Sequence, residues 1–109
     1  MTPDEARVKA EQLYKDGLAA FRRGDQDESR RINEQVLKLG EEHHDDESIV
    51  RGLIGLSRIA LRDGDHATLR VLCERAMPLW ERLEDRSVVT SPIHLLAESA
   101  RLEGALERA

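Results

Sequence analysis

The fold is decided by a phrase that the chain uses twice, FRRGDQDE at residues 21–28 and LRDGDHAT at residues 61–68. In both copies a glycine and an aspartate follow a segment rich in leucine, alanine and arginine. Glycine accepts the left-handed backbone that commonly follows the last turn of a helix, and aspartate caps the first turn of the next one. The phrase therefore predicts the tight turn of a helical hairpin.

The repetition extends outward from this phrase. Three positions before each turn recur at steps of forty residues, and they are occupied by Leu13, Leu53 and Ile93, by Gly17, Ser57 and Ala97, and by Ala20, Ala60 and Ala100. Their spacing predicts one face of an α-helix, and the small residues on it allow a neighbouring helix to approach closely. An internal repeat of this length is typical of stacked helical units.

The remaining helix starts are also marked. Thr2-Pro3 and Ser91-Pro92 each place a capping hydroxyl before a proline at the first helical position. We expect an all-α chain of five helices, near residues 3–23, 26–40, 47–63, 66–84 and 92–107. They form one domain, residues 1–109, with units at 1–40 and 46–84 and a C-terminal helix at 91–109. Gly52, inside the third helix, is expected to accept alanine without loss of stability.

A family resemblance follows from these residues. The tract LIGLSRIALRDGDHATLRVLCERAMPLWERLED, residues 53–85, resembles the tetratricopeptide repeat, and the period of about forty residues resembles that of the longer repeats in bacterial regulatory proteins. The resemblance implies a right-handed α-α superhelix of about two and a half hairpins. It also implies a non-enzymatic module, an adaptor or regulatory domain, that binds a protein or peptide in a concave groove.

The predicted groove is lined by the first helix of each unit. Its residues are Tyr14, Leu18, Phe21, Arg22, Ile54, Arg58, Leu61, Arg62, His94 and Arg101. Apolar side chains beside arginines suit a partner helix or peptide with apolar anchors and carboxylates, because a guanidinium pairs with a carboxylate through two hydrogen bonds. The alternative is that these arginines are only solvated.

The last helix carries two apolar stripes. We expect the stripe of Ile93, Leu96, Ala97 and Ala100 to pack onto the second unit. The stripe of Leu95, Leu102 and Leu106 is then expected to face away and to be covered by a second copy in a homodimer, unless the chain is a fragment whose covering helix is missing. A self-associating structural homodimer without a peptide ligand is the alternative function.

The stretch HHDDE, residues 43–47, holds side chains that bind divalent metals. A small metal-dependent enzyme using this cluster is the weaker alternative. The competing interpretation is a polar turn in which Asp45 or Asp46 caps the third helix. Cys73 is the only cysteine, which excludes an intramolecular disulfide, and it is expected to be a small buried residue. We predict no catalytic residue, no metal ligand and no cofactor.

Charge and hydropathy exclude several classes of protein. The net charge is −5, and the arginines are interleaved with acidic residues, which is not the clustered basic face of a nucleic-acid binder. No apolar run reaches membrane-spanning length, and the N-terminal segment MTPDEARVKAEQ is too charged for a signal peptide. We therefore expect a cytoplasmic protein that binds neither nucleic acid nor membrane.

Overall fold

A computed structural model describes the backbone of residues 1–108 and the side chains of residues 1–105, and over this range the chain is all-helical without strands. The elements are α1 (Pro3–Arg22), α2 (Gln26–Glu42), α3 (Asp46–Asp63), α4 (His66–Glu81), the short 3₁₀-helix η1 (Arg86–Val88) and α5 (Pro92–Arg108). The five predicted α-helices are confirmed, with ends shifted by up to three residues. η1 was not predicted.

The glycine–aspartate turns have the geometry that the repeated phrase predicts. Gly24 and Gly64 have φ angles of +85° and +72°, in the left-handed region. The carboxylates of Asp25 and Asp65 accept hydrogen bonds from the backbone N–H groups of Glu28 and Thr68. Each turn therefore ends one helix and caps the next within three residues, and this short connection makes the two helices antiparallel neighbours.

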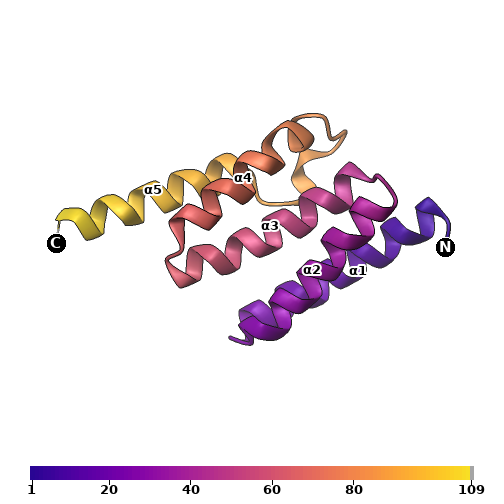
Figure 1. Cartoon of the computed structure of the whole chain (residues 1–109), viewed down its shortest axis with the longest axis horizontal. Helices are drawn as coiled ribbons and strands as arrows, with labels where there is room; N and C mark the ends of the chain where they lie inside the picture. The colour runs from indigo at the N-terminus through magenta and orange to yellow at the C-terminus, as the bar shows by residue number, and fades with distance from the viewer. Residues whose placement is uncertain (109) are drawn as a thin grey trace.

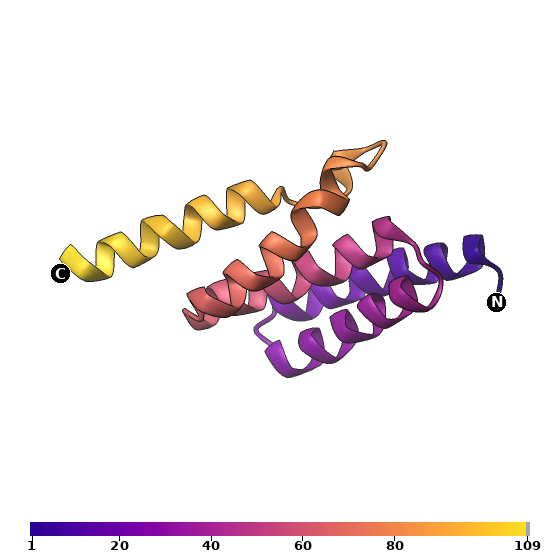
Figure 2. The same cartoon turned by 45° about the horizontal axis from the view of Figure 1, so that its top comes forward.

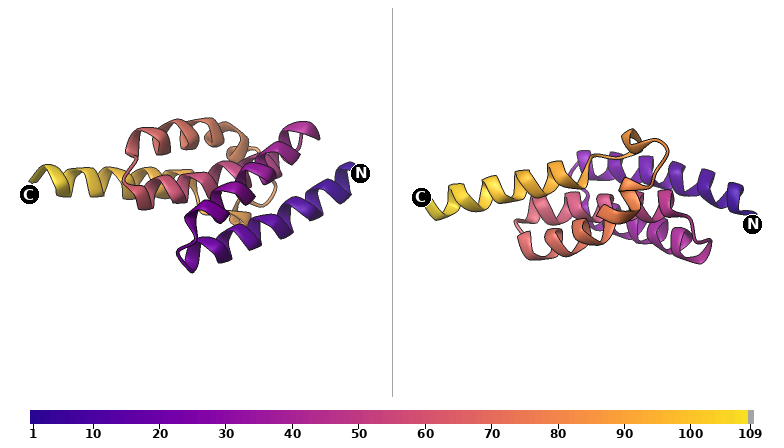
Figure 3. Two further views of the ribbon diagram at one scale, coloured as in Figure 1. Left: turned by 60° about the horizontal axis from the view of Figure 1, so that its bottom comes forward. Right: turned by 90° about the horizontal axis from the view of Figure 1, so that it is seen from above.

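The helices stack in chain order (Figures 1 and 3). α2 packs most extensively on α1 and α3, α4 packs on α3, and α5 packs mainly on α4. The termini lie at opposite ends of a molecule that measures 51 × 30 × 19 Å. α3 lies in the middle of this stack, which is why residues on every side of it are buried, Val50, Leu53, Ile54 and Ile59 among them.

The connection between α4 and α5 differs from the other turns. Helix α4 continues past Pro78 and ends at Glu81, three residues earlier than predicted, and a ten-residue segment follows. That segment packs back on the stack, because Val89 is buried in the core and the Trp80 indole N–H donates to the Arg86 carbonyl at 3.2 Å. Among the described residues, no helix combines the length and the apolar character that a membrane span requires.

Candidate functional site

The predicted groove is partly closed by its own side chains. Tyr14 of α1 and Ile54 of α3 were expected to be exposed for a partner, but their exposed fractions are 7% and 0%. The reason is that α1 packs directly against α3, so that both residues lie in the shared core. Leu18, Phe21 and Leu61 are half-buried, so of the predicted groove residues on these two helices only Arg22 and Arg62 are well exposed.

The two arginines predicted on α3 are bound within the chain. Arg58 donates from Nη1 to the Tyr14 hydroxyl at 2.6 Å and from Nη2 to the Thr90 hydroxyl at 2.7 Å. The guanidinium of Arg62 lies 3.4 Å from the centre of the Phe21 ring and donates to the Phe21 carbonyl. A guanidinium held over an aromatic ring makes a cation–π contact. These side chains tie α3 to α1 and to the loop before α5.

The remaining predicted groove residues lie on α5, which the structure places beside α4 rather than along α1 (Figure 2). His94 and Arg101 are exposed, and Arg101 pairs with Glu98 of its own helix. The structure therefore does not gather the ten predicted residues into one continuous strip.

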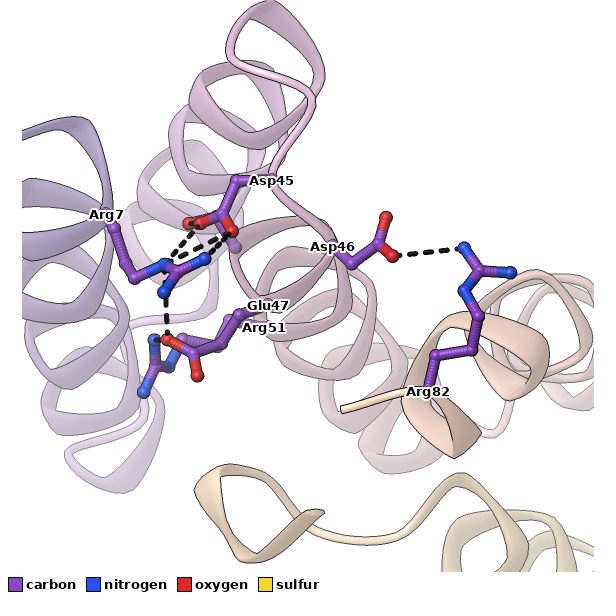
Figure 4. Close-up of polar contacts among 7 residues, drawn as sticks. Arg7, Asp45, Asp46, Glu47, Arg51 and Arg82 are labelled. Atoms are coloured by element: carbon purple, nitrogen blue, oxygen red, sulfur yellow. Dashed lines mark hydrogen bonds and ion pairs between the residues drawn. The ribbon is translucent and has the colours of Figure 1, made fainter. Parts of the chain in front are cut away.

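The HHDDE stretch forms an ionic joint between helices (Figure 4). Asp45, at the N-cap of α3, accepts from Arg7 of α1 at 2.7 Å and from the Ser48 hydroxyl at 2.5 Å. Burial disfavours the charged carboxylate, but the hydrogen bonds from Arg7 and Ser48 outweigh it and hold the pKa of Asp45 below its ordinary value. Asp45 thus occupies the predicted capping position, and its carboxylate binds the side chains of Arg7 and Ser48.

The other carboxylates of this joint bring in two further arginines, and Glu47 also lies 3.8 Å from Nε of Arg7. Asp46 pairs with Arg82 beyond α4 at 3.0 Å, and Glu47 pairs with the buried Arg51 at 2.7 Å. They border an open, polar hollow of about 350 Å³. Within the described residues, no three histidine, cysteine, aspartate or glutamate side chains are arranged to hold a metal ion. The arrangement joins α1, α3 and the end of α4 by ion pairs.

Cys73 lies where the sequence places it, fully buried between α3 and α4. Its sulfur is 3.6 Å from the Ser57 hydroxyl, and burial raises the pKa of the thiol. A raised pKa keeps the thiol protonated and a poor nucleophile, which fits a packing role.

The two apolar stripes of α5 are placed only partly as predicted: Leu96 packs against the core as expected, whereas Leu95 and Ile93 are exchanged. Leu95, expected to face away from the domain, is buried at 5% exposure in the main core. Ile93, expected to pack onto the second unit, is 56% exposed, and Ala97 and Ala100 are exposed with it. Leu102 is half-buried, and the side chain of Leu106 lies outside the described residues. Leu95 of the proposed dimer stripe is therefore an intramolecular contact.

The repeat register explains this exchange. Helix α3 rests on α2 through Gly52 and Gly55, which approach Leu37 and Asn33 so closely that an added Cβ would lie within 3 Å of them. Forty residues later the corresponding positions of α5 are Pro92 and Leu95, and both are buried. Helix α5 thus packs on the second unit as α3 packs on the first.

In the first two units, the stripe of small residues (Gly17 and Ala20, then Ser57 and Ala60) packs against the second helix of the same unit. Gly17 of α1 faces α2, because its carbonyl accepts from the Ser29 hydroxyl at 2.8 Å and its Cα lies against Asn33. Ser57 of α3 faces Cys73 of α4. This stripe, which we call the hairpin face, is covered by the second helix of each unit.

On α5 the hairpin face comprises Ile93, Ala97, Ala100 and Gly104. Figure 2 shows α5 at the end of the stack, with α4 on one side and no described helix on the other. Sequence reasoning identified the stripe but assigned it to the wrong neighbour. The signal that could have corrected it is the position of Gly55, whose close contact with α2 predicts that Leu95 is buried.

Comparison of the chain with models of protein families, with curated proteins and with solved structures returns no match.

Proposed function

We propose that the chain is a non-enzymatic protein-interaction module, built as a right-handed stack of tetratricopeptide-like units, that receives a helix of another polypeptide on the hairpin face of α5. The observation that carries the proposal is the exposure of Ile93, Ala97 and Ala100 at positions whose counterparts are covered by α2 in the first unit and by α4 in the second.

The chemistry of the surface supports a helical ligand. A flat face of small residues lets a second helix approach closely, as Gly17 and Ser57 do within the chain. The helices that cover this face in the first two units present Ser29, Asn33 and Val36, or Leu69, Cys73 and Ala76, and all of these are buried. We therefore expect the bound helix to be amphipathic, with small or medium side chains at this i, i+4, i+7 spacing.

The concave groove is a weaker location for the same function. Its arginines Arg58 and Arg62 are engaged with Tyr14 and Phe21, so a carboxylate ligand would have to displace bonds that hold α1 to α3. Removing both arginines would therefore disturb the fold as well as any ligand contact. Substitutions on α5 avoid this difficulty, because the hairpin face makes no such internal contacts among the described residues.

The proposal is tested with a ligand of the expected pattern. A fluorescent peptide of residues 64–84, which contains α4 and its cap, is titrated with the wild-type protein and with Ala97→Glu, and binding is followed by anisotropy. We expect binding to the wild type and a loss of at least about tenfold in Ala97→Glu, since the carboxylate would be buried without a partner. Ala105→Glu, the same change at an exposed position off this face, is the control.

If the wild-type protein bound neither this peptide nor the corresponding α2 peptide, residues 24–42, the proposed function would be contradicted. Equal binding to Ala97→Glu and the wild type would place the docking surface elsewhere.

A further inference from the structure

The hairpin face of α5 has an order of side-chain sizes that is complementary to itself. From its N-terminal end, this face presents the large side chain of Ile93, the small side chains of Ala97 and Ala100, and Gly104, which has no side chain. Ile93 and Gly104 lie equally far from the midpoint between the two alanines. When such a stripe meets an antiparallel copy, each isoleucine lies opposite a glycine and each alanine opposite an alanine, which is the large-against-small matching that close helix packing needs.

Antiparallel pairing is also the arrangement that this face already has within the chain. The covering helices α2 and α4 run antiparallel to α1 and α3, because a turn of only two or three residues joins each pair. A two-fold axis through the midpoint of α5 would place the partner's α5 in the orientation that α2 has toward α1. The contact between α5 of two copies would therefore have the same antiparallel arrangement as the contacts of α1 with α2 and of α3 with α4 within one chain.

Charges beside the face do not oppose this contact. Glu98 pairs with Arg101 on the same helix, and Glu103 pairs with Arg70 of α4 at 2.7 Å. These pairs neutralise one another inside each protomer, so two copies would not bring uncompensated like charges together at this surface. Residues 92–109 contribute only −1 to the net charge of −5, and five acidic residues lie in GEEHHDDE at residues 40–47.

We propose that the hairpin face of α5 is covered by the same face of a second copy of this chain, in a two-fold antiparallel contact of α5 with α5. This inference rests on the proposed function and identifies its partner as a like chain. One pair of helices forms a small interface, so the dimer is expected to be weak, with a dissociation constant of about 10–100 µM.

Sedimentation velocity over a series of concentrations tests the contact. The wild type is expected to pass from monomer to dimer as the concentration rises to about 200 µM. Ala97→Glu is expected to weaken association about 100-fold, because two carboxylates per dimer would be buried against Ala100 of the opposite copy. Ala105→Glu, in the same helix but off the hairpin face, is expected to dimerise as the wild type does.

Gly104→Leu separates a fold defect from an interface defect. A Cβ at Gly104 has no neighbour within 4 Å, so the monomer has room for the side chain and its melting temperature should not fall. In the dimer, the leucine would collide with Ile93 of the other copy and weaken association at least about tenfold. Circular dichroism confirms that each variant is folded.

The outcomes distinguish this inference from the function on which it rests. A wild type that stays monomeric at 200 µM while it binds the α4 peptide through Ala97 would overturn the second copy as partner and leave the interaction module standing. A monomer that also binds neither the α2 nor the α4 peptide would overturn both. A dimer that survives Ala97→Glu and Gly104→Leu would show that the copies meet elsewhere.

Discussion

At the scale of single residues, the carboxylate of Asp45 shows how one side chain can join segments that are distant in the sequence. Asp45 binds Arg7, which is 38 positions away, and also the Ser48 hydroxyl in the first turn of its own helix. The charged form is favoured in the fold despite partial burial, so that the pKa of Asp45 is lowered from its ordinary value of 3.8. A lowered pKa of this kind makes stability depend on pH.

We predict that this contribution disappears in acid. The folded-state pKa lies below the unfolded one, so the stabilisation is complete above pH 3.8 and is lost as the pH falls through the folded-state value. Urea denaturation of the wild type and of Asp45→Asn at pH 5 and at pH 3 measures it. The stability difference between the two proteins should shrink at pH 3, and an equal difference at both values would contradict the role given to Asp45.

Residue-scale contacts are where sequence reasoning was least able to predict the site. The arginines of α3 were identified from their spacing, but an arginine side chain is long enough to select its partner only after the helices have packed. Arg58 reaches Tyr14 across 44 positions and Thr90 across 32. No local pattern specifies such pairs, so the interpretation of Arg58 as a free ligand for carboxylates is not supported by the structure.

At the scale of elements, the helices and their turns were predictable because their signals are local. Glycine, aspartate and proline act within one turn of the chain, and Gly64 with Asp65 has the predicted conformation and hydrogen bond. The orientation of α5 was not predictable from periodicity alone, because both of its stripes are apolar and helically spaced. Deciding between them needs the three-dimensional contact of Gly55 with Asn33.

The orientation of α5 leads to a prediction with two substitutions on one helix. Leu95→Ala removes a side chain that is 5% exposed and should cost about 2–4 kcal/mol of unfolding free energy through lost burial and a cavity. Ile93→Ala removes a side chain that is 56% exposed and should change the monomer's stability by about 0.5 kcal/mol or less. Chemical denaturation at low micromolar concentration measures both. If Ile93→Ala were the more damaging change, the assignment of the two faces would be wrong.

The glycines of the helices give a second prediction at this scale, and it reverses the sequence-based expectation for Gly52. A Cβ at Gly52 would lie 2.7 Å from the Leu37 backbone nitrogen, so Gly52→Ala should push α3 from α2 and cost about 1–3 kcal/mol. Gly104→Ala, in open space, should be neutral or gain up to about 1 kcal/mol from helix propensity. Thermal melts of the two variants provide the comparison, and a stabilised Gly52→Ala would refute the close contact of α2 with α3.

At the scale of the whole molecule, one structural regularity underlies both the proposed binding of a helix and the proposed dimer. Helix α5 repeats the packing of α3 on the preceding unit, and no helix of the described residues covers its hairpin face. The proposed binding of a helix and the proposed dimer both follow from this open face. The architecture was accessible from the forty-residue repeat, whereas the open face required knowledge of which neighbour covers each stripe.

The solvent exposure of the Ile93 δ1-methyl group is the measurement that tests this open face most directly. The chain has five isoleucines, of which Ile54 and Ile59 are 0% and 2% exposed and serve as internal references. With isoleucine δ1-methyl labelling and a soluble paramagnetic gadolinium chelate, we expect strong signal loss at Ile93 and little at the references when the protein is dilute. We expect Ile93 to become protected as the protein is concentrated or the α4 peptide is added. An Ile93 methyl that is protected at high dilution, or that stays exposed under every one of these conditions, would contradict the account.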